Sequence, residues 1–401
     1  MKKNILFVIP NLCAGGAEKS LVNLLSHIDY RLYKVDLFLF HKSGTFTNSI
    51  PKEVNILDSS ERFSAFCNGF FYFVFYLIKR RELKAIFHRV IFTLINRLVK
   101  NKNLAEQYTW KQLKFFIEGI EKEYDVAISY LEKSSLYYTV EKVRAQKKIG
   151  WIHTNYTNSG MKNKLDKEFL KQLNSIITVS EECRESLYKE FPENKDKTFV
   201  INNILSPTVI NVQAAKVTND LSKFESDYLN IVTIARLSYE KGIDLALKSC
   251  VKLIKHGYKV KWFIIGEGPE RKLLEKLIKI NNLEQNFVLL GIKENPYPYL
   301  KKADIYVQPS RYEGKSIAIE EAKILQKPII ITNFQTARDQ IQSKYDGLVV
   351  NMDEKGIFDG VISLLNNISL RKQIIRNLNE KFHGNENEII KFYEIIEGEV
   401  L

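Results

Sequence analysis

Short runs of apolar residues, rich in Val, Ile and Phe, recur along the chain and are separated by longer amphipathic segments. Such runs are typical of strands buried on both faces of a parallel sheet, and the segments between them have helical periodicity. The pattern predicts an α/β protein with two doubly wound sets of strands. The expected strands are residues 5–9, 34–40, 54–57, 124–129, 148–152 and 175–179 in the first set, and 231–235, 259–265, 287–291, 304–308, 327–332 and 348–350 in the second.

The length of the chain predicts two domains. A chain of 401 residues is too long for one ordinary core and suits two domains of about 200 residues each. We place the first domain at 1–205, the second at 206–385 and a final helix at 386–401. Residues 206–228 are polar without periodicity, so we expect a linker there. The apolar start of the chain stops at Pro10 and enters a glycine-rich loop, which favours a first strand over a signal peptide.

One helix is expected between the strands at 304–308 and 327–332. Ser316 is placed to cap its first turn, and apolar residues follow at helical spacing. A helix that follows a parallel strand presents free backbone N–H groups and a partial positive charge at the carboxyl edge of the sheet. An anion would therefore bind well at this helix N-terminus.

Two carboxylates, Glu313 and Glu321, frame this helix N-terminus. Eight residues separate them by about 12 Å along the axis if the helix starts near Glu313. This span suits a nucleoside diphosphate sugar, with one carboxylate at the sugar, the other at the ribose hydroxyls and the backbone amides of residues 315–317 on the phosphates. Two glutamates at this spacing are also common on solvated helices, but the flanking strands favour the binding interpretation.

Two further loops follow strands of the second set. Arg236 and Lys241 can converge on a diphosphate, Arg through its planar fork and Lys as a compact charge, although a solvated pair has the same spacing. The turn at residues 266–269, Gly-Glu-Gly-Pro, lacks the third glycine of a dinucleotide-binding fingerprint. We therefore interpret it as a tight strand-to-helix turn that borders the nucleotide base.

Candidate residues of the first domain also follow strands. Gly15 and Gly16 let the backbone of the first loop approach a ligand, as in many α/β folds, including some that bind nothing. His153 follows the strand at 148–152, and although a lone histidine is often structural, ligands of α/β proteins bind at this edge. Glu132, after the strand at 124–129, is expected to be solvated.

Much of the positive charge lies at residues 61–116. This segment has eleven Lys or Arg and three Asp or Glu residues, a net charge of +8 out of +13 for the whole chain. Its uncharged aromatic run at 63–78 is shorter than the roughly 20 residues needed to span a bilayer. Such a run followed by basic residues is typical of helices lying at an anionic lipid surface. The residues expected at that surface are Lys79, Arg80, Arg81, Lys84 and Arg89.

Two other interpretations of this segment remain open. An aromatic-rich helical hairpin packed on the protein's own core, with its basic face in solvent, has the same pattern. Nucleic acid would also suit the charge, but no recognised nucleic-acid-binding motif accompanies it. We therefore expect contact with an anionic membrane and no nucleic acid.

Three motifs together resemble the retaining glycosyltransferases of family 4, which have the GT-B fold of two Rossmann-like domains facing a cleft. They are Glu-Gly-x6-Glu-Ala at 313–322, Ala-Arg-Leu-x3-Lys-Gly at 235–242 and Gly-Gly-Ala-Glu-Lys at 15–19. One departure is Lys315-Ser316, where the family often has an aromatic residue and then Gly or Pro. The last helix of GT-B enzymes typically crosses back onto the first domain, and residues 388–400 are the candidate.

The resemblance implies a role for each candidate residue. Arg236 and Lys241 look like the clamp for the donor diphosphate, and His153 looks like the histidine near the transferred sugar. The implied catalytic residues are His153, Glu313, Arg236 and Lys241. The implied donor-binding residues are Gly15, Gly16, Arg236, Lys241, Gly266, Glu313, Gly314, Lys315, Ser316, Ile317 and Glu321.

The reaction implied by the resemblance is retaining transfer of a hexosyl group from a nucleotide diphosphate sugar, without a metal ion or another cofactor. No Asp-x-Asp motif occurs in the sequence. A UDP-sugar is the favoured donor, with GDP-mannose as the alternative. The expected acceptor is a polyprenyl-diphosphate-linked saccharide at the cytoplasmic face of the membrane, in the synthesis of a bacterial capsule, exopolysaccharide or O-antigen.

Three other functions remain open. A nicotinamide oxidoreductase would need a complete glycine fingerprint and an acidic residue about 20 positions on. A nucleotide-sugar 2-epimerase shares the fold but would consume donor without an acceptor. A non-catalytic partner subunit would keep the fold and lose donor binding. The four cysteines are far apart and lack metal-ligand spacing, so we expect reduced thiols.

Overall fold

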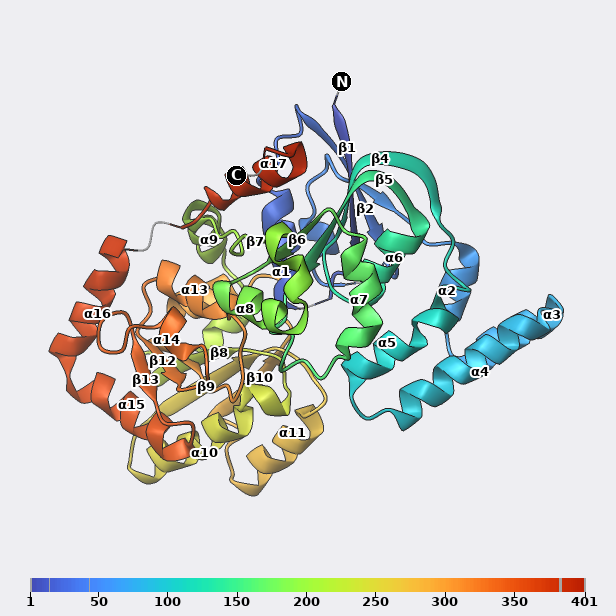
Figure 1. The fold of residues 1–401 in the computed structure, drawn as a ribbon. Helices are drawn as coiled ribbons and strands as arrows, with labels where there is room; N and C mark the ends of the chain where they lie inside the picture. The colour runs from blue at the N-terminus through green and yellow to red at the C-terminus, as the bar shows by residue number, and fades with distance from the viewer. Residues whose placement is uncertain (1, 14, 43, 382–383, 400–401) are drawn as a thin grey trace. The chain divides into compact units, whose positions relative to one another are not determined.

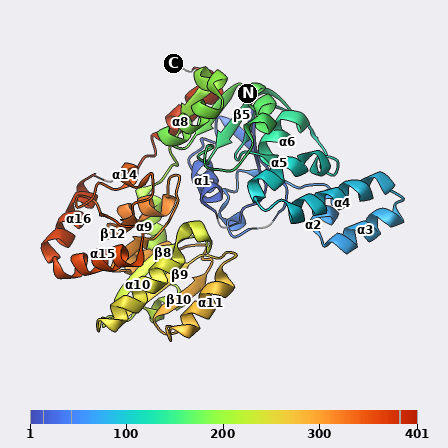
Figure 2. The same cartoon turned by 60° about the horizontal axis from the view of Figure 1, so that its bottom comes forward.

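The computed structural model describes residues 2–13, 15–42, 44–381 and 384–399, and it divides into two compact units that are described separately. Unit 1 comprises residues 1–204 and 387–401, and unit 2 comprises residues 205–386. Figure 1 shows in each unit a sheet with helices on both faces, and Figure 2 shows the same chain from a second direction. Both sheets are parallel, so the predicted α/β class with two doubly wound sheets is confirmed.

Unit 1 is built on a seven-stranded sheet with the order β3-β2-β1-β4-β5-β6-β7. The strands are β1 (Lys3–Ile9), β2 (Tyr33–Leu39), β3 (Asn55–Leu57), β4 (Ile120–Ser129), β5 (Val143–Ile152), β6 (Ser175–Thr178) and β7 (Thr198–Val200). Along β1, Ile5 and Phe7 lie in one core while Leu6 and Val8 lie in the other, and none of them is exposed. The alternation of side chains along the strand therefore places one core on each face of the sheet.

Helices from both ends of the chain cover the sheet of unit 1 (Figure 1). The helices α1 (Gly16–Leu25) and α17 (Glu388–Glu397) pack on one face, and α5 (Lys102–Leu113), α6 (Ser134–Lys142) and α7 (Asn163–Lys171) on the other. The ring of Phe392 in α17 lies 6.1 Å from that of Phe7 and 6.2 Å from that of Trp151. The helix expected at 388–400 thus ends at Glu397, and Val400 lies outside the described residues.

Unit 2 has a six-stranded sheet with the order β10-β9-β8-β11-β12-β13. The strands are β8 (Leu229–Ile234), β9 (Val260–Ile265), β10 (Phe287–Gly291), β11 (Ile305–Gln308), β12 (Ile329–Thr332) and β13 (Leu348–Val350). One face carries α10 (Ile243–Lys255), α11 (Arg271–Ile280), α15 (Glu354–Asn366) and α16 (Ile368–Lys381), and the other carries α9 (Pro207–Ala214), α12 (Tyr297–Lys302), α13 (Ile317–Ile324) and the short α14 (Ala337–Gln340). Since the strands are parallel, the loops after β8, β9 and β11 leave the sheet at one edge.

The linker predicted at 206–228 is wrong, because α9 forms there. The hydroxyl of Ser206 accepts a hydrogen bond from the N–H of Val209, and Pro207 occupies the first turn, where a proline is well tolerated. Ile210 and Ala214, one turn apart, are buried in the core of unit 2. The buried face of α9 is only two residues wide, so hydrophobic periodicity alone does not reveal the helix.

The basic and aromatic segment forms α2 (Glu61–Cys67), α3 (Phe70–Lys79) and α4 (Leu83–Leu98), followed by α5. Figures 1 and 2 both show α3 and α4 side by side at the periphery of unit 1. One side of this hairpin packs inward through Phe73, Leu77 and Ala85. Among the residues that the structure describes, no helix has both the length and the hydropathy to cross a bilayer.

The other side of the α3–α4 hairpin exposes large apolar residues at helical spacing. We call these eight residues the apolar stripe: Phe71, Phe75 and Ile78 of α3, and Leu83, Phe87, Val90, Leu94 and Leu98 of α4. Their exposed fractions run from 36% to 85%, whereas the outer face of a helix in water is usually polar. The hairpin thus combines the packed side of an internal hairpin with an exposed apolar side.

The prediction that Arg89 lies at the surface is wrong. Arg89 is 9% exposed, and its guanidinium lies over the rings of Phe66 and Phe92, at 4.6 and 5.5 Å from their centroids. It also donates a hydrogen bond to Thr93 Oγ1 at 3.2 Å. A planar guanidinium stacks well on aromatic faces, which explains its burial among phenylalanines. The other predicted surface residues, Lys79, Arg80, Arg81 and Lys84, are exposed.

Truncating Phe392 tests how strongly α17 stabilises unit 1. Because Phe392 has no exposed surface, we expect Phe392→Ala to lower the free energy of unfolding by about 3–5 kcal/mol. Urea unfolding followed by circular dichroism measures this change. Ile390→Ala on the same helix is the control, because Ile390 is 54% exposed and its truncation should cost less than about 0.5 kcal/mol. Equal effects of the two substitutions would contradict the packing of α17.

Candidate functional site

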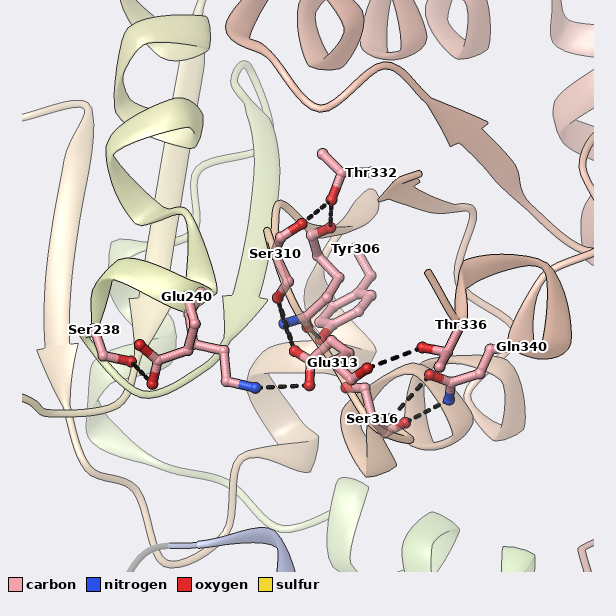
Figure 3. Close-up of polar contacts among 11 residues, drawn as sticks. Ser238, Glu240, Tyr306, Ser310, Glu313, Ser316, Thr332, Thr336 and Gln340 are labelled. Carbon is pink, nitrogen blue, oxygen red and sulfur yellow. Dashed lines mark hydrogen bonds and ion pairs between the residues drawn. The ribbon is translucent and has the colours of Figure 1, made fainter. Parts of the chain in front are cut away.

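A buried polar network surrounds the loop between β11 and α13 (Figure 3). The expected spacing of Glu313 and Glu321 assumed a helix that starts near Glu313. This assumption is wrong, because α13 starts at Ile317. The backbone N–H groups of Arg311 and Tyr312 donate to the carbonyl oxygen of Glu240 at 2.8 and 3.2 Å. These contacts with another loop hold the chain outside a helix until Ser316.

Glu313 is at the centre of this network. It is 6% exposed, and its carboxylate accepts hydrogen bonds from Ser310 Oγ at 2.7 Å and Gln308 Nε2 at 3.0 Å. The ammonium group of Lys241 forms an ion pair with it at 2.6 Å. A buried carboxylate needs a cation and hydrogen-bond donors in place of water, and Glu313 has both. The structure therefore brings the predicted residues Glu313 and Lys241 into direct contact.

Lys241 reaches Glu313 from the loop after β8. This loop contains the 3-10 helix η4 (Tyr239–Lys241) and then Gly242, which has a φ of 63°. A Cβ atom added at Gly242 would lie 2.0 Å from the carbonyl oxygen of Pro309, so glycine is required for the close approach of the two loops. Arg236 lies on the same loop and is exposed. Both cations of the predicted clamp thus lie between β8 and α10.

Two carboxylates beside the predicted clamp were missed by sequence reasoning. Burial raises the pKa of Glu240, but a hydrogen bond from Ser238 Oγ at 2.7 Å and the nearby cations lower it below its usual value. Asp244 forms a two-point ion pair with Arg311, at 2.7 and 2.8 Å. Arg311 and Asp244 are 67 positions apart, and no local pattern in the sequence links them.

The turn after β9 packs against the same loop. Gly266 has a φ of 148°, and a Cβ atom added there would lie 2.0 Å from the carbonyl oxygen of Ala235. At Gly268 the added atom would lie 2.3 Å from the carbonyl oxygen of Leu237. These glycines permit close contact between two stretches of backbone, as a tight strand-to-helix turn requires. Contact of Gly266 with a nucleotide stays a prediction.

Glu321 lies on α13 and is 1% exposed. The hydroxyl of Tyr297 donates a hydrogen bond to its Oε1 at 3.0 Å. Burial and the negative charge of Glu321 raise the pKa of Tyr297 well above its usual value, so the tyrosine keeps its proton and remains a donor. Binding of a ribose by Glu321 stays a prediction.

The N-terminus of α13 differs in one respect from the expected anion site. Ser316 is the N-cap, but its side chain makes no capping hydrogen bond, and its N–H donates to Gln340 Oε1 at 2.9 Å. This amide is therefore committed to a partner inside the protein. A Cβ atom added at Gly314 would meet nothing within 4 Å, so there is open space beside it. Lys315 and Ile317 are partly exposed.

The remaining predicted residues lie in unit 1. Gly15 is the N-cap of α1, and Gly16 is its first residue. The imidazole of His153 bonds to the backbone of Tyr130, and its Nε2 is buried without a hydrogen-bond partner among the described residues. Burial lowers the pKa of His153 to about 4, although the charge of Glu132 acts in the opposite direction. The imidazole is therefore neutral at pH 7.

The prediction that Glu132 is solvated is wrong. Glu132 is 6% exposed and accepts hydrogen bonds from Thr154 Oγ1 at 2.6 Å and from the N–H of His153 at 3.3 Å. Burial raises the pKa of Glu132, but the charge of Lys133 and the bond from Thr154 lower it below its usual value. Lys133 has a φ of 63°, a conformation that is uncommon outside glycine and that no hydrophobic pattern reveals.

The structure also limits what could hold a metal ion. Within the described ranges, no group of three or more His, Cys, Asp or Glu side chains is placed to bind one. Lys241 forms an ion pair with Glu313, and the charge of Arg236 acts on Glu240. The absence of a cofactor stays a prediction.

Comparison with known proteins identifies a family and relatives. Residues 219–381 match the family described as glycosyl transferases group 1. The chain is 26% identical over 220 residues to the poly(ribitol-phosphate) alpha-N-acetylglucosaminyltransferase of Staphylococcus aureus strain COL, over 54% of this chain and 42% of that protein. It is 28% identical over 199 residues to the N-acetylgalactosamine-N,N'-diacetylbacillosaminyl-diphospho-undecaprenol 4-alpha-N-acetylgalactosaminyltransferase of Campylobacter jejuni, over 49% and 52%. The chain thus spans about half the length of these curated relatives.

The fold is shared with solved structures over the whole chain. Anabaena Alr3699/HepE in complex with UDP has a TM-score of 0.68 and 14% sequence identity, over 99% of this chain and 100% of that chain. At this identity the likeness shows the fold alone. The fold is GT-B, as the resemblance of the three motifs implied.

The neutral imidazole of His153 should make the stability of unit 1 depend on pH. Its folded pKa of about 4 lies below the ordinary value of 6.5, so the unfolded state binds the proton more tightly. The stabilisation is present above the unfolded pKa and is lost as the pH falls toward the folded one. Between pH 7 and pH 5 we expect a loss of about 1–2 kcal/mol in wild type that is smaller in His153→Gln. Urea unfolding at both pH values measures it, and parallel losses in the two proteins would contradict this assignment.

Proposed function

We propose that the chain, whose residues 219–381 match the family described as glycosyl transferases group 1, transfers a hexosyl group from a nucleoside diphosphate sugar to a lipid-linked saccharide. The observation that carries the proposal is the ion pair of Lys241 and Glu313, in loops that follow neighbouring strands of unit 2. It presents a cation and a carboxylate at the edge where α/β folds bind ligands. These charges suit a ligand with a negative diphosphate and a sugar rich in hydroxyl groups.

In this proposal the diphosphate binds to Arg236 and Lys241. Negative charge develops on the diphosphate as its bond to the anomeric carbon breaks, and fixed cations stabilise that charge. Arg236 is exposed and offers a planar guanidinium, while Lys241 is oriented by Glu313. The acceptor hydroxyl attacks from the face that the diphosphate leaves and gives its proton to the departing diphosphate oxygen, so the anomeric configuration is retained, and no metal ion is needed.

Three further residues have separate roles in the proposal. Glu313 accepts hydrogen bonds from hydroxyl groups of the transferred sugar, and Glu321 accepts them from the ribose. His153 is the candidate for a neutral hydrogen bond to the sugar, because its Nε2 is without a partner among the described residues. The charge of Glu313 is compensated by Lys241, and His153 is neutral.

A UDP-sugar is the donor that we propose, with GDP-mannose as the alternative. Support comes from the HepE structure, which contains UDP. The Campylobacter relative is named for transfer to a saccharide on diphospho-undecaprenol, and the Staphylococcus relative for transfer to poly(ribitol-phosphate). The Campylobacter name supports a polyprenyl-diphosphate-linked acceptor, and we place the reaction in the synthesis of a bacterial surface polysaccharide.

Removing the charge of Lys241 should weaken nucleotide binding. Lys241→Met keeps most of the side-chain length, and we expect the dissociation constant of UDP to rise roughly ten- to a hundredfold, since a charged hydrogen bond contributes about 1.5–3 kcal/mol. Isothermal titration calorimetry measures the constant. Lys276→Met is the control, because Lys276 is exposed on α11, and this variant should bind UDP like wild type.

The outcomes of this experiment separate the proposal from its alternatives. Unchanged UDP affinity in both Arg236→Ala and Lys241→Met would show that the clamp is assigned wrongly. Wild type should use a UDP-sugar only when a lipid-linked acceptor is present, whereas donor consumption without acceptor would indicate a 2-epimerase. A wild-type protein that binds no nucleotide sugar would be a non-catalytic partner subunit.

We also propose that unit 1 contacts the inner face of the cell membrane through the α3–α4 hairpin. Lys79, Arg80, Arg81 and Lys84 are exposed around the turn between the two helices. The apolar stripe runs from this turn along both helices. Such a surface suits a headgroup region, where apolar side chains insert and cations meet anionic lipids. Membrane contact would bring the protein to a lipid-linked acceptor.

Reversing the charge of the turn should release the protein from anionic vesicles. The variant carries Lys79→Glu, Arg80→Glu, Arg81→Glu and Lys84→Glu. Each basic side chain near an anionic surface contributes about 1 kcal/mol, additive only in part, so we expect vesicle affinity to fall at least about tenfold. Cosedimentation with phosphatidylserine vesicles measures it. High salt should weaken wild-type binding, because charges are screened over about 10 Å at 0.1 M.

A charge-matched variant controls for net charge. It carries Lys272→Glu, Lys276→Glu, Lys279→Glu and Lys301→Glu, at four lysines that are exposed in unit 2. We expect it to bind vesicles like wild type, and circular dichroism checks that both variants fold. Wild type that stays in the supernatant with anionic vesicles, or equal release of both variants, would refute the membrane assignment.

A further inference from the structure

We propose that Thr336 and Gln340 are positioning residues, which hold the backbone between Glu313 and Ser316 in the geometry that a nucleoside diphosphate sugar requires. The proposal rests on the proposed function, because it assigns a purpose to contacts of the same loop. Both residues belong to one short segment, with Thr336 preceding α14 and Gln340 ending it. Neither residue carries a sequence motif or a predicted role.

Gln340 binds the backbone of Ser316 on both sides. Its Oε1 accepts from the N–H of Ser316 at 2.9 Å, and its Nε2 donates to the carbonyl oxygen of Ser316 at 2.9 Å. The same Nε2 also donates to Glu320 Oε1 at 3.1 Å. Gln340 is 3% exposed, so water does not compete for these bonds. The side-chain amide thus fixes the peptide groups on both sides of Ser316 at the start of α13.

Thr336 holds the other end of the same segment. It is 2% exposed, and its hydroxyl donates to the carbonyl oxygen of Glu313 at 3.1 Å. Figure 3 shows Thr336 and Gln340 together on one side of the loop, facing Glu313 and Ser316. Two side chains four positions apart therefore fix both ends of a segment of four residues.

Residues 314 and 315 are not fixed by packing, so hydrogen bonds to the ends of this segment have to constrain its backbone. Beyond Gly314 and its two chain neighbours, no described atom lies within 4 Å of a Cβ added at Gly314, and Lys315 is partly exposed. Glycine also gives the backbone more freedom than any other residue. Without Thr336, the carbonyl oxygen of Glu313 would lose its hydrogen bond from the Thr336 hydroxyl. Without Gln340, the backbone of Ser316 at the start of α13 would lose its two hydrogen bonds to the Gln340 side chain.

The segment that provides the hold is itself anchored. Ala337 and Ile341 are 1% exposed and lie in the core of unit 2. The ammonium group of Lys323, on α13, donates to the carbonyl oxygen of Gln340. A binding geometry is accurate only when the residues that support it are locked by packing and hydrogen bonds. The anchored α14 meets this condition for the loop of Glu313.

The hold should also persist when a donor binds. The N–H of Ser316 is already bonded to Gln340, so an incoming phosphate has to use other amides of the helix start. The orientation of those amides follows from the position of Ser316. Gln340 thereby acts on the ligand through the loop and does not touch it, which distinguishes a positioning residue from a binding residue.

The test compares substitutions that keep the size of each side chain. Thr336→Val removes the hydroxyl and keeps the volume, whereas Thr336→Ser keeps the hydroxyl. Gln340→Leu removes all three hydrogen bonds. We expect Thr336→Val and Gln340→Leu to raise the dissociation constant of UDP about tenfold, because a buried backbone group loses its partner in each. Thr336→Ser should bind UDP like wild type.

Unit 1 offers a matched control for each variant. Gln107 is 5% exposed and binds the backbone of Lys162 on both sides, at 2.8 and 3.2 Å, as Gln340 binds Ser316. Thr198 is 5% exposed and its hydroxyl donates to the carbonyl oxygen of Asn194 at 2.7 Å. Gln107→Leu and Thr198→Val should lower the midpoint of thermal unfolding about as much, and leave UDP affinity unchanged.

Hydrogen exchange of the Ser316 amide provides a readout that does not depend on any ligand. We expect this amide to be protected in wild type and to exchange faster in Gln340→Leu. Faster exchange with unchanged UDP affinity would overturn the positioning role and leave the proposed function intact. If the control variants also lose UDP affinity, a general loss of stability explains the effect. That result would overturn the positioning role as well. If wild type binds neither UDP nor a UDP-sugar, the proposed function fails, and the inference fails with it.

Discussion

In unit 2 an ion pair between a buried carboxylate and a lysine joins two loops that are far apart in the sequence. Glu313 lies after β11 and Lys241 after β8, and these strands are neighbours in the sheet. Removing one partner of a buried ion pair costs several kcal/mol, so each loop constrains the other. Gly242 permits the contact, because a side chain there would collide with the backbone of the facing loop. The remaining contacts of the site depend on this arrangement.

Unit 1 also contains a buried carboxylate, Glu132, which binds a loop through hydrogen bonds. Glu132 accepts hydrogen bonds from the backbone of His153 and from Thr154, so it holds the loop after β5 in place. The imidazole of His153 stays neutral, because burial lowers its pKa. Unit 2 thus supplies fixed charge and unit 1 an uncharged hydrogen-bonding group.

The α3–α4 hairpin shows that one segment can satisfy the fold and still expose apolar surface. Phe73, Leu77 and Ala85 pack the hairpin into the core of unit 1, and the guanidinium of Arg89 stacks on Phe66. The apolar stripe contributes nothing to this core. Exposed apolar patches of this kind usually mark a binding surface. The basic residues beside the stripe favour an anionic lipid surface over a neutral partner.

The sequence by itself determined the parts of the protein whose signal is local. Apolar runs defined the strands and placed Lys241 and Glu313 in loops that follow strands, because the ends of a strand are set by adjacent residues. That these two strands are neighbours in the sheet was decided by the tertiary structure. Only the tertiary structure decided that Glu132 and Arg89 are buried and that Gln340 holds Ser316. A glutamate, arginine or glutamine has the same local pattern in water and in a buried network. Its place depends on a partner tens of residues away, which hydrophobic periodicity does not encode.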